Sequence, residues 1–107
     1  MVHKTNDSGL QEYLKSHPKI VIKFYANWCG VCRLFASKFT KVSNKNGNEK
    51  LLFLEINAEE NPWARNFVSF SNLPFLSIVS NGQVIEASST SKIEYLESMI
   101  ERLKTCE

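Results

Sequence analysis

The chain has 107 residues, 43% of them hydrophobic, and a formal net charge of only +2. This length suits one domain with an ordinary core, so we expect a single domain over residues 1–107. Charges of mixed sign form neither a basic surface nor an acidic tail, which argues against nucleic acid and membranes as partners. No apolar stretch approaches the roughly 20 residues needed to cross a bilayer.

The three cysteines are an odd number in a chain able to build its own core, which argues against a disulfide-stapled secreted scaffold. The first residues, Met1 to Asn6, lack the hydrophobic segment of a signal peptide. We therefore expect a soluble, cytoplasmic monomer. A form whose targeting segment had been trimmed would look the same.

The first predicted helix begins at a capping box of Ser8 and Gln11. Residues 19–26 are nearly all apolar and rich in β-branched and aromatic types, which predicts a strand buried on both faces. After Cys29 and Gly30, apolar residues at helical spacing predict a helix that ends near residues 44–48. The members of that stripe are Val31, Leu34, Phe35, Phe39 and Val42.

A second strand is expected at residues 51–56, and Pro62 is positioned to start a helix to about Val68. The next predicted strand, residues 75–80, follows Leu73-Pro74, because proline is tolerated before a strand.

Asn81-Gly82 then predicts a tight hairpin, since both central residues of a type I′ turn need positive φ. Ser91 and Glu94 form a capping box for a last amphipathic helix. Parallel strands joined by helices, together with one hairpin, indicate an α/β fold with a central mixed sheet flanked by helices.

Cys29 and Cys32 lie between the predicted buried strand and the first turn of a predicted helix. Unpaired N–H groups and the helix dipole stabilise a thiolate there, lowering the pKa of the outer cysteine toward neutrality. Cys29 is therefore the predicted nucleophile. Cys32, one helical turn away, could attack a mixed disulfide at Cys29 and release the reduced client, and Gly30 would let that client approach closely.

Two other interpretations of the cysteine pair stay open. A Cys-x-x-Cys also supplies half of many zinc sites, but a second pair is missing because His3, His17 and Cys106 are scattered singly. The cysteines could also be buried without chemistry. We expect no metal and no bound cofactor.

The segment Phe24-Tyr25-Ala26-Asn27-Trp28-Cys29-Gly30-Val31-Cys32 resembles the active-site segment of the thioredoxin family, usually Trp-Cys-Gly-Pro-Cys. The resemblance covers nearly the whole chain: residues 53–57 resemble the family's third strand, and Asn81-Gly82 its hairpin. It implies a three-layer thioredoxin-like fold with helices on both faces of the sheet.

Leu73-Pro74 resembles the family loop whose proline is cis and faces the cysteines. The resemblance implies that Pro74 keeps a donor and metal away from the sulfurs, while the Leu73 backbone pairs with an extended client. Trp28 and Val31 would border the same groove. The alternative for Trp28 is a partly buried aromatic ring that packs against the strand end.

Two of the positions that depart from the family pattern lie close to the chemistry. Val31 stands where proline is usual, and Lys23 stands where a buried aspartate usually handles the proton of the resolving cysteine. Glu55 falls where some members carry a lysine that faces this aspartate. We therefore expect an ion pair between Lys23 and Glu55 with the two charges exchanged relative to the family. Three roles for Lys23 stay open. A charged amine would favour a thiolate at Cys32, and a neutral amine could accept the proton of the Cys32 thiol. If the aliphatic part of the side chain only packs in the sheet and the ammonium reaches outward to solvent, Lys23 would do neither.

The leading hypothesis is an enzyme: a thiol–disulfide oxidoreductase that acts on protein disulfides and is recharged by a reductase or another dithiol. The alternative is a binding or adaptor module that keeps the fold but turns over weakly or not at all. Val31 and a charged Lys23 would each favour the reduced state, so we expect a dithiol less strongly reducing than a typical thioredoxin. Cys106 is expected to be an exposed thiol near the chain end.

Overall fold

The computed structural model describes residues 1–69 and 72–106. Within them, strands and helices alternate for most of the chain. The elements are β1 (Val2–Thr5), α1 (Asp7–Ser16), β2 (Lys19–Tyr25), α2 (Gly30–Ser43), β3 (Leu52–Asn57), α3 (Pro62–Val68), β4 (Phe75–Ser80), β5 (Gln83–Ser89) and α4 (Ile93–Thr105). Among the described residues, no helix is both long and apolar enough to span a membrane.

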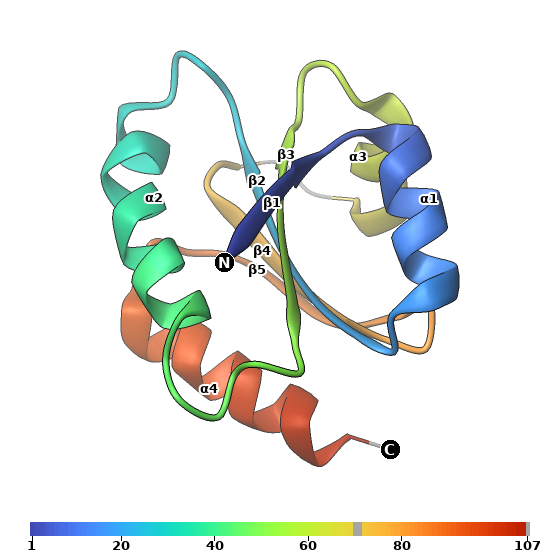
Figure 1. The fold of residues 1–107 in the computed structure, drawn as a ribbon. Helices are drawn as coiled ribbons and strands as arrows, with labels where there is room; N and C mark the ends of the chain where they lie inside the picture. The colour runs from blue at the N-terminus through green and yellow to red at the C-terminus, as the bar shows by residue number, and fades with distance from the viewer. Residues whose placement is uncertain (70–71, 107) are drawn as a thin grey trace.

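The strands form one mixed sheet in the order β1-β3-β2-β4-β5 (Figure 1). β1, β3 and β2 run parallel, whereas β4 is antiparallel to β2 and β5 is antiparallel to β4. The hairpin between β4 and β5 turns at Asn81 and Gly82, whose φ angles of 51° and 81° are those the predicted turn requires. The expected α/β fold with a central mixed sheet is confirmed.

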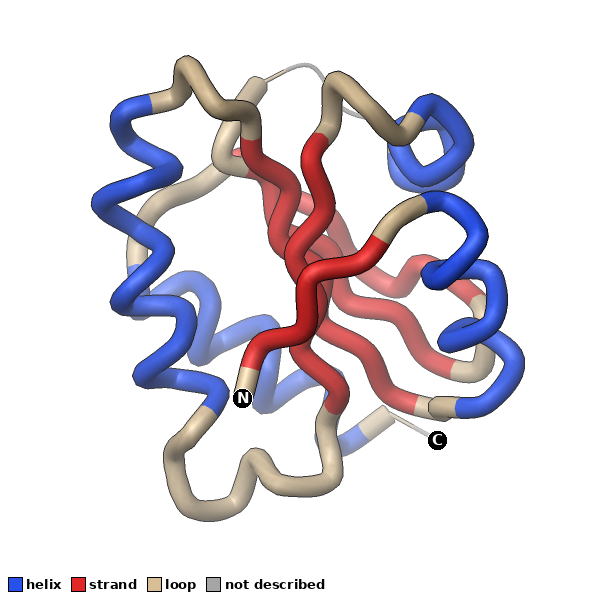
Figure 2. Tube along the Cα trace, turned by 45° about the horizontal axis from the view of Figure 1, so that its top comes forward, coloured by secondary structure: helices blue, strands red, loops and turns tan. Residues whose placement is uncertain are grey.

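Helices cover both faces of this sheet, α1 and α3 on one and α2 and α4 on the other (Figures 1 and 2). The central strand β2 serves both cores because successive side chains of a strand point to opposite faces. Ile22 packs in the core beneath α1 and α3, and Val21 in the core beneath α2 and α4. Lys23 shares the face of Val21, so its amine lies on the α2 side.

Strand β1 is the element that the sequence analysis missed. It has only four residues, two of which are exposed, and it forms one edge of the sheet beside β3. A short edge strand that pairs with one neighbour needs few apolar residues, so its sequence shows no clear alternation of apolar and polar residues.

Two members of the predicted apolar stripe of α2 do not belong to its buried face. Val31 is 50% exposed and Leu34 is 74% exposed, whereas Phe35 and Phe39 are buried against the sheet. The stripe is therefore narrower than predicted, and its first apolar residues face solvent beside the cysteines.

Both predicted capping boxes were also wrong. Helix α1 starts earlier, because the Asn6 side chain accepts a hydrogen bond from Gly9 N and acts as the cap. Helix α4 is preceded by Lys92, which makes no side-chain capping bond, while the Thr90 hydroxyl accepts from Lys92 N at 3.1 Å. In neither case does the serine three residues before a glutamine or glutamate form the predicted cap.

Helix α4 is fixed to β5 by a polar cluster on the surface. Arg102 Nε donates to Glu86 Oε1 at 2.6 Å, and Tyr95 Oη donates to Glu86 Oε2 at 3.0 Å. The Arg102 guanidinium holds the pKa of Glu86 below its usual value, mainly through this hydrogen bond. The last helix is thereby tied to the edge of the sheet.

Helix α3 is capped by a residue from another helix. Its own N-cap residue, Asn61, makes no side-chain capping bond, but Asp7 at the start of α1 accepts from Trp63 N at 3.1 Å and from Ala64 N at 2.8 Å. Asp7 N in turn donates to the Asn61 side chain at 2.9 Å. One carboxylate thus satisfies two free donors of α3 and joins the two helices on that face.

We expect Asp7→Ala to lower the free energy of unfolding by about 1–2 kcal/mol, the usual cost of losing a helix cap. Denaturant unfolding followed by circular dichroism would measure it. Glu12→Ala, on the exposed side of the same helix, is the matched control and should change stability by less than about 0.5 kcal/mol. Equal effects of the two variants would contradict the capping role of Asp7.

Candidate active site

The two cysteines lie where β2 ends and α2 begins. After Tyr25 the chain turns, with Cys29 N donating to Ala26 O at 3.1 Å. Cys29 is the N-cap residue of α2, and its Sγ accepts a hydrogen bond from Cys32 N at 3.2 Å. The sulfur of Cys29 thus faces the free N–H groups and positive dipole end of a 14-residue helix, as the sequence pattern predicts.

Cys29 and Cys32 form a disulfide, with their Cα atoms 5.3 Å apart. Cys29 is 6% exposed and Cys32 is 2% exposed, so the outer sulfur belongs to the first cysteine of the pair. Ala26 is buried with them, and Tyr25 and Leu73 pack against this small cluster.

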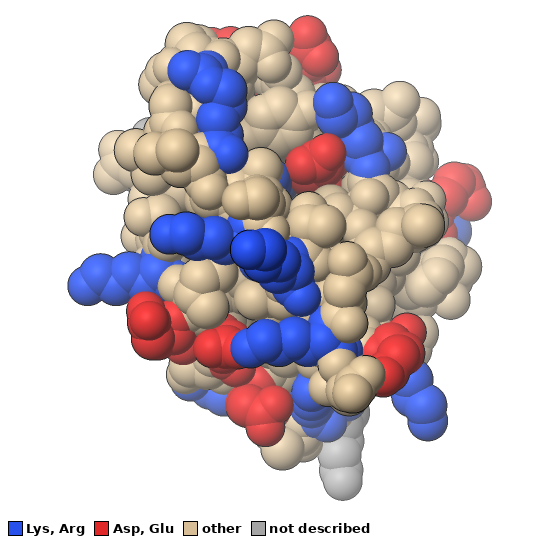
Figure 3. Space-filling model, turned by 60° about the vertical axis from the view of Figure 1, so that its left-hand side comes forward, with Lys and Arg blue, Asp and Glu red and all other residues tan. Residues whose placement is uncertain are grey.

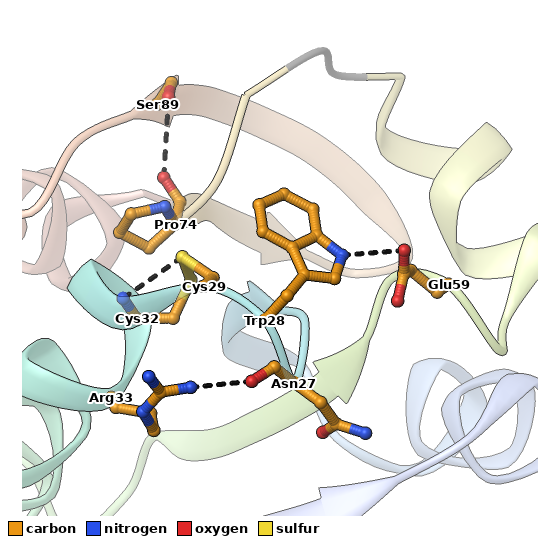
Figure 4. Close-up of a disulfide and its surroundings, with 8 residues drawn as sticks. All are labelled: Asn27, Trp28, Cys29, Cys32, Arg33, Glu59, Pro74 and Ser89. Carbon is orange, nitrogen blue, oxygen red and sulfur yellow. Dashed lines mark hydrogen bonds between the residues drawn. A yellow bond between two sulfur atoms is a disulfide. The ribbon is translucent and has the colours of Figure 1, made fainter.

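Pro74 lies beside the disulfide at the start of β4 (Figure 4). The Leu73–Pro74 peptide bond is cis, the form that the family resemblance implies. Pro74 O accepts from Thr90 N at 3.2 Å and from the Ser89 hydroxyl at 3.5 Å, which connects this loop to the end of β5. Leu73 and Pro74 are therefore brought to the cysteines from a distant part of the chain.

Trp28 stands on the solvent side of the site and is 67% exposed. Its indole Nε1 donates to Glu59 Oε2 at 2.8 Å, a contact drawn in Figure 4. The alternative of a partly buried ring packed against the strand end is therefore wrong. The indole is held by a hydrogen bond at its polar edge, and most of the residue stays exposed to solvent.

Lys23 and Glu55 form the ion pair expected with exchanged signs. They are direct neighbours on the parallel strands β2 and β3, and Lys23 Nζ lies 3.1 Å from Glu55 Oε2. The Lys23 side chain is 2% exposed, with its nitrogen 5.6 Å from the ring centre of Tyr25 and 5.4 Å from that of Phe39. Lys23 does not reach solvent, so the interpretation of an outward-reaching stem is wrong.

A cavity of about 200 Å³ connects this ion pair to the inner cysteine. Its lining includes Lys23, Glu55 and Cys32, and it opens between β1 and the start of α2, where Lys4 and Arg33 border it. Glu55 is 25% exposed through this opening. The ion pair and the inner cysteine thus line one small space.

Three residues of this region were missed by the sequence analysis. Glu59 holds Trp28, Arg33 Nη1 donates to Asn27 O at 2.6 Å, and Lys4 lies 5.7 Å from the ring centre of Tyr25. Arg33, next to Cys32 in the sequence, could have been noticed from that position alone. Glu59 and Lys4 come from other elements, and no local pattern marks them.

Cys106 is a free cysteine of intermediate exposure at the C-cap of α4, less exposed than expected. Within residues 1–69 and 72–106, no group of three or more His, Cys, Asp or Glu side chains is placed to hold a metal ion.

Comparison with known proteins gives concordant results. The family model described as Thioredoxin matches residues 1–102. A putative thioredoxin-5 from Dictyostelium discoideum is 31% identical over 98 residues, which cover 92% of this chain and 93% of that protein.

Among solved structures, a thioredoxin from Malassezia sympodialis superimposes with a TM-score of 0.86 at 22% identity, covering 97% of this chain and 94% of the other. A thioredoxin f2, crystallised in a complex with ferredoxin:thioredoxin reductase, superimposes with a TM-score of 0.88 at 20% identity over 97% and 96% of the two chains. These likenesses confirm the three-layer fold. Given the family match along nearly its whole length and the paired cysteines at the start of α2, the chain belongs to the thioredoxin family of thiol–disulfide oxidoreductases.

Proposed function

We propose that the chain reduces protein disulfides through Cys29 and is recharged by a separate electron donor. The Cys29 thiolate attacks one sulfur of the client's disulfide, forming a mixed disulfide and releasing the other client sulfur as a thiolate. Cys32, deprotonated, then attacks Cys29 Sγ, which closes the Cys29–Cys32 disulfide and frees the second client sulfur, and both client thiolates take up protons. A dithiol or reductase returns two electrons to the pair.

The observation that carries this proposal is the position of the dithiol at the start of α2. A sulfur that accepts a backbone N–H at the positive end of a helix is stabilised as a thiolate. Its partner is close enough for a disulfide and lies deeper. This order of exposure supports Cys29 as the nucleophile that meets the client and Cys32 as the residue that resolves the mixed disulfide.

Lys23 acts, in this proposal, on the second step. Resolution needs a thiolate at Cys32, and a buried thiolate is stabilised by a nearby positive charge. The cavity shared by Lys23, Glu55 and Cys32 supports this role, because it joins the amine and the sulfur through one small space. Glu55, which reaches the opening, would pass the proton to solvent.

The client-binding groove is proposed to run across the cysteines between Trp28 and the Leu73–Pro74 loop. Exposed apolar surface at Trp28 and Val31 supports one wall. Gly30 leaves clearance at the reacting sulfur, because a Cβ added there would meet only the end of the Arg33 side chain, 3.8 Å away. The backbone of Leu73 would pair with an extended client segment, since an extended peptide can form strand-like hydrogen bonds with backbone N–H and C=O groups that are free at a sheet edge.

A reductase is the proposed source of electrons. The thioredoxin f2 of similar fold was crystallised with ferredoxin:thioredoxin reductase, which supports a partner of the reductase class. We also propose that the protein works as a cytoplasmic monomer in electron transport. The free thiol of Cys106 supports a reducing compartment, because unpaired cysteines are ordinary there.

Reduction of insulin with dithiothreitol as donor tests the proposed function. The protein should accelerate precipitation of the insulin B chain well beyond dithiothreitol alone. A folded protein that binds a client but gives no acceleration would instead support the adaptor hypothesis.

The reduction potential of the pair is expected to lie above about −270 mV, the reference value for thioredoxin. Val31 keeps an N–H at the helix start that proline lacks, and Lys23 replaces an anion by a cation near Cys32, so both changes favour the reduced dithiol. Equilibration against glutathione, with the oxidised fraction read by thiol alkylation and mass spectrometry, measures this potential. A value at or below the reference would contradict the expectation.

A further inference from the structure

The outer face of α2 is positively charged along its length. Residues Gly30–Ser43 include Arg33, Lys38 and Lys41 and contain no aspartate or glutamate. All three side chains are exposed. Figure 3 shows basic side chains running down the face that presents α2, with acidic side chains gathered mostly in its lower part.

These cations keep their charge available to a partner. Ion pairs among the described residues involve Lys15, Lys23, Lys45, Arg102 and Lys104. The three cations of α2 and Lys4 take part in none of them. Arg33 is positioned by its bond to the uncharged Asn27 carbonyl, and Lys4 by the ring of Tyr25.

This charged surface reaches the dithiol itself. Lys4 and Arg33 border the cavity that Cys32 lines, and the only carboxylate in the described lining, Glu55, is already paired with Lys23 at 3.1 Å. The cavity mouth therefore carries an excess of two positive charges, contributed by Lys4 and Arg33. An incoming segment with a carboxylate on this side of the disulfide would meet uncompensated cations.

The opposite side of the site has the opposite charge. Beyond Trp28, the segment before α3 presents Glu59 and Glu60, both exposed, and Glu59 is held in place by the indole N–H. The site thus lies between the basic face of α2 and the two glutamates of the segment before α3. Such an arrangement discriminates between clients by the charge of the residues beside their cystine.

We propose that Lys4, Arg33, Lys38 and Lys41 form a selectivity surface, which favours protein disulfides flanked by aspartate or glutamate. The proposal deepens the proposed function and rests on it, because the surface acts by steering a client toward Cys29. Electrostatic steering of this kind raises association rates by roughly tenfold or more and weakens as salt screens the charges.

Three peptides of identical length test this surface, each with one disulfide flanked by glutamates, glutamines or lysines. The reduced protein is mixed with each peptide, and the second-order rate constant is read from product thiols, at about 0.01 M and about 1 M salt. Each value is divided by the rate for dithiothreitol, because flanking charge alters the intrinsic reactivity of a disulfide. At low salt, the acidic peptide should react about tenfold faster than the basic one, and the ratio should approach unity at high salt.

Variants locate the effect on α2. Lys38→Glu/Lys41→Glu should abolish or invert the preference while leaving the glutamine peptide unchanged. Lys15→Glu/Lys50→Glu makes the same change in net charge on α1 and in the loop before β3, and should keep most of the preference. Equal rates for the three peptides, or equal losses in both double variants, would overturn the proposal. Failure to reduce even the glutamine peptide would instead refute the proposed function.

Discussion

Replacing Cys29 by serine is expected to reduce insulin turnover to the rate of dithiothreitol alone. The serine hydroxyl can occupy the N-cap of α2 and keep the helix start intact, but it cannot form a mixed disulfide. Circular dichroism and the unfolding midpoint should therefore stay close to those of the reduced wild type. Retention of substantial turnover would show that Cys29 is not the nucleophile.

Cys32→Ser is expected to stop the same cycle one step later. With the buried partner removed, the mixed disulfide at Cys29 persists, and intact-mass spectrometry after mixing with a thionitrobenzoate disulfide should show a stable adduct. The wild type should release the second thionitrobenzoate as its own disulfide closes. The wild-type dithiol and both variants are compared in a chain that carries Cys106→Ser, since that free thiol would otherwise add a separate adduct. A stable adduct on Cys32 in Cys29→Ser at the same rate would reverse the assigned roles.

Much of this site could be predicted from the sequence because its central part is local. Strand, turn, cysteine pair and helix follow one another within residues 19–43, and the change from a continuous apolar run to a helical stripe locates the dithiol at a helix start. The partnership of Lys23 and Glu55 could also be predicted, because the family resemblance aligned two strands that prove to be parallel neighbours.

Contacts between distant elements that the family resemblance does not cover could not be predicted. Glu59 and Lys4 join the site only because β1 and β3 run parallel to β2 and end at the same edge of the sheet. Asp7 caps a helix more than fifty residues away, a contact for which no sequence pattern exists. Even the exposure of Leu34 depends on where α2 meets the sheet rather than on the spacing of its apolar residues.

The ion pair between β2 and β3 should respond unequally to removal of its two members. Glu55→Ala leaves the ammonium of Lys23 in a position that is 2% exposed, so we expect a loss of about 3–5 kcal/mol in the free energy of unfolding. Lys23→Met leaves a carboxylate that is 25% exposed and can be hydrated, so its cost should be nearer about 1 kcal/mol. Glu12→Ala, which breaks a pair 3.9 Å long between exposed side chains, is the matched control and should cost less than about 0.5 kcal/mol.

The double variant Lys23→Met/Glu55→Leu separates the folding role of this pair from its chemical one. Replacing both charges by apolar groups of similar size should restore stability to within about 1 kcal/mol of the wild type, because no buried charge is left without a partner. Denaturant unfolding of the single and double variants measures these free energies. Equal losses in the free energy of unfolding for Glu55→Ala and Lys23→Met would refute the assumed difference in hydration between the two remaining charges. In the stable double variant, attack by Cys29 should proceed normally while closure of the Cys29–Cys32 disulfide slows, since the cavity loses the buried ammonium that favours a thiolate at Cys32 and keeps only Lys4 and Arg33 at its mouth. If the rate of disulfide closure is unchanged in that variant, Lys23 and Glu55 have only a structural role.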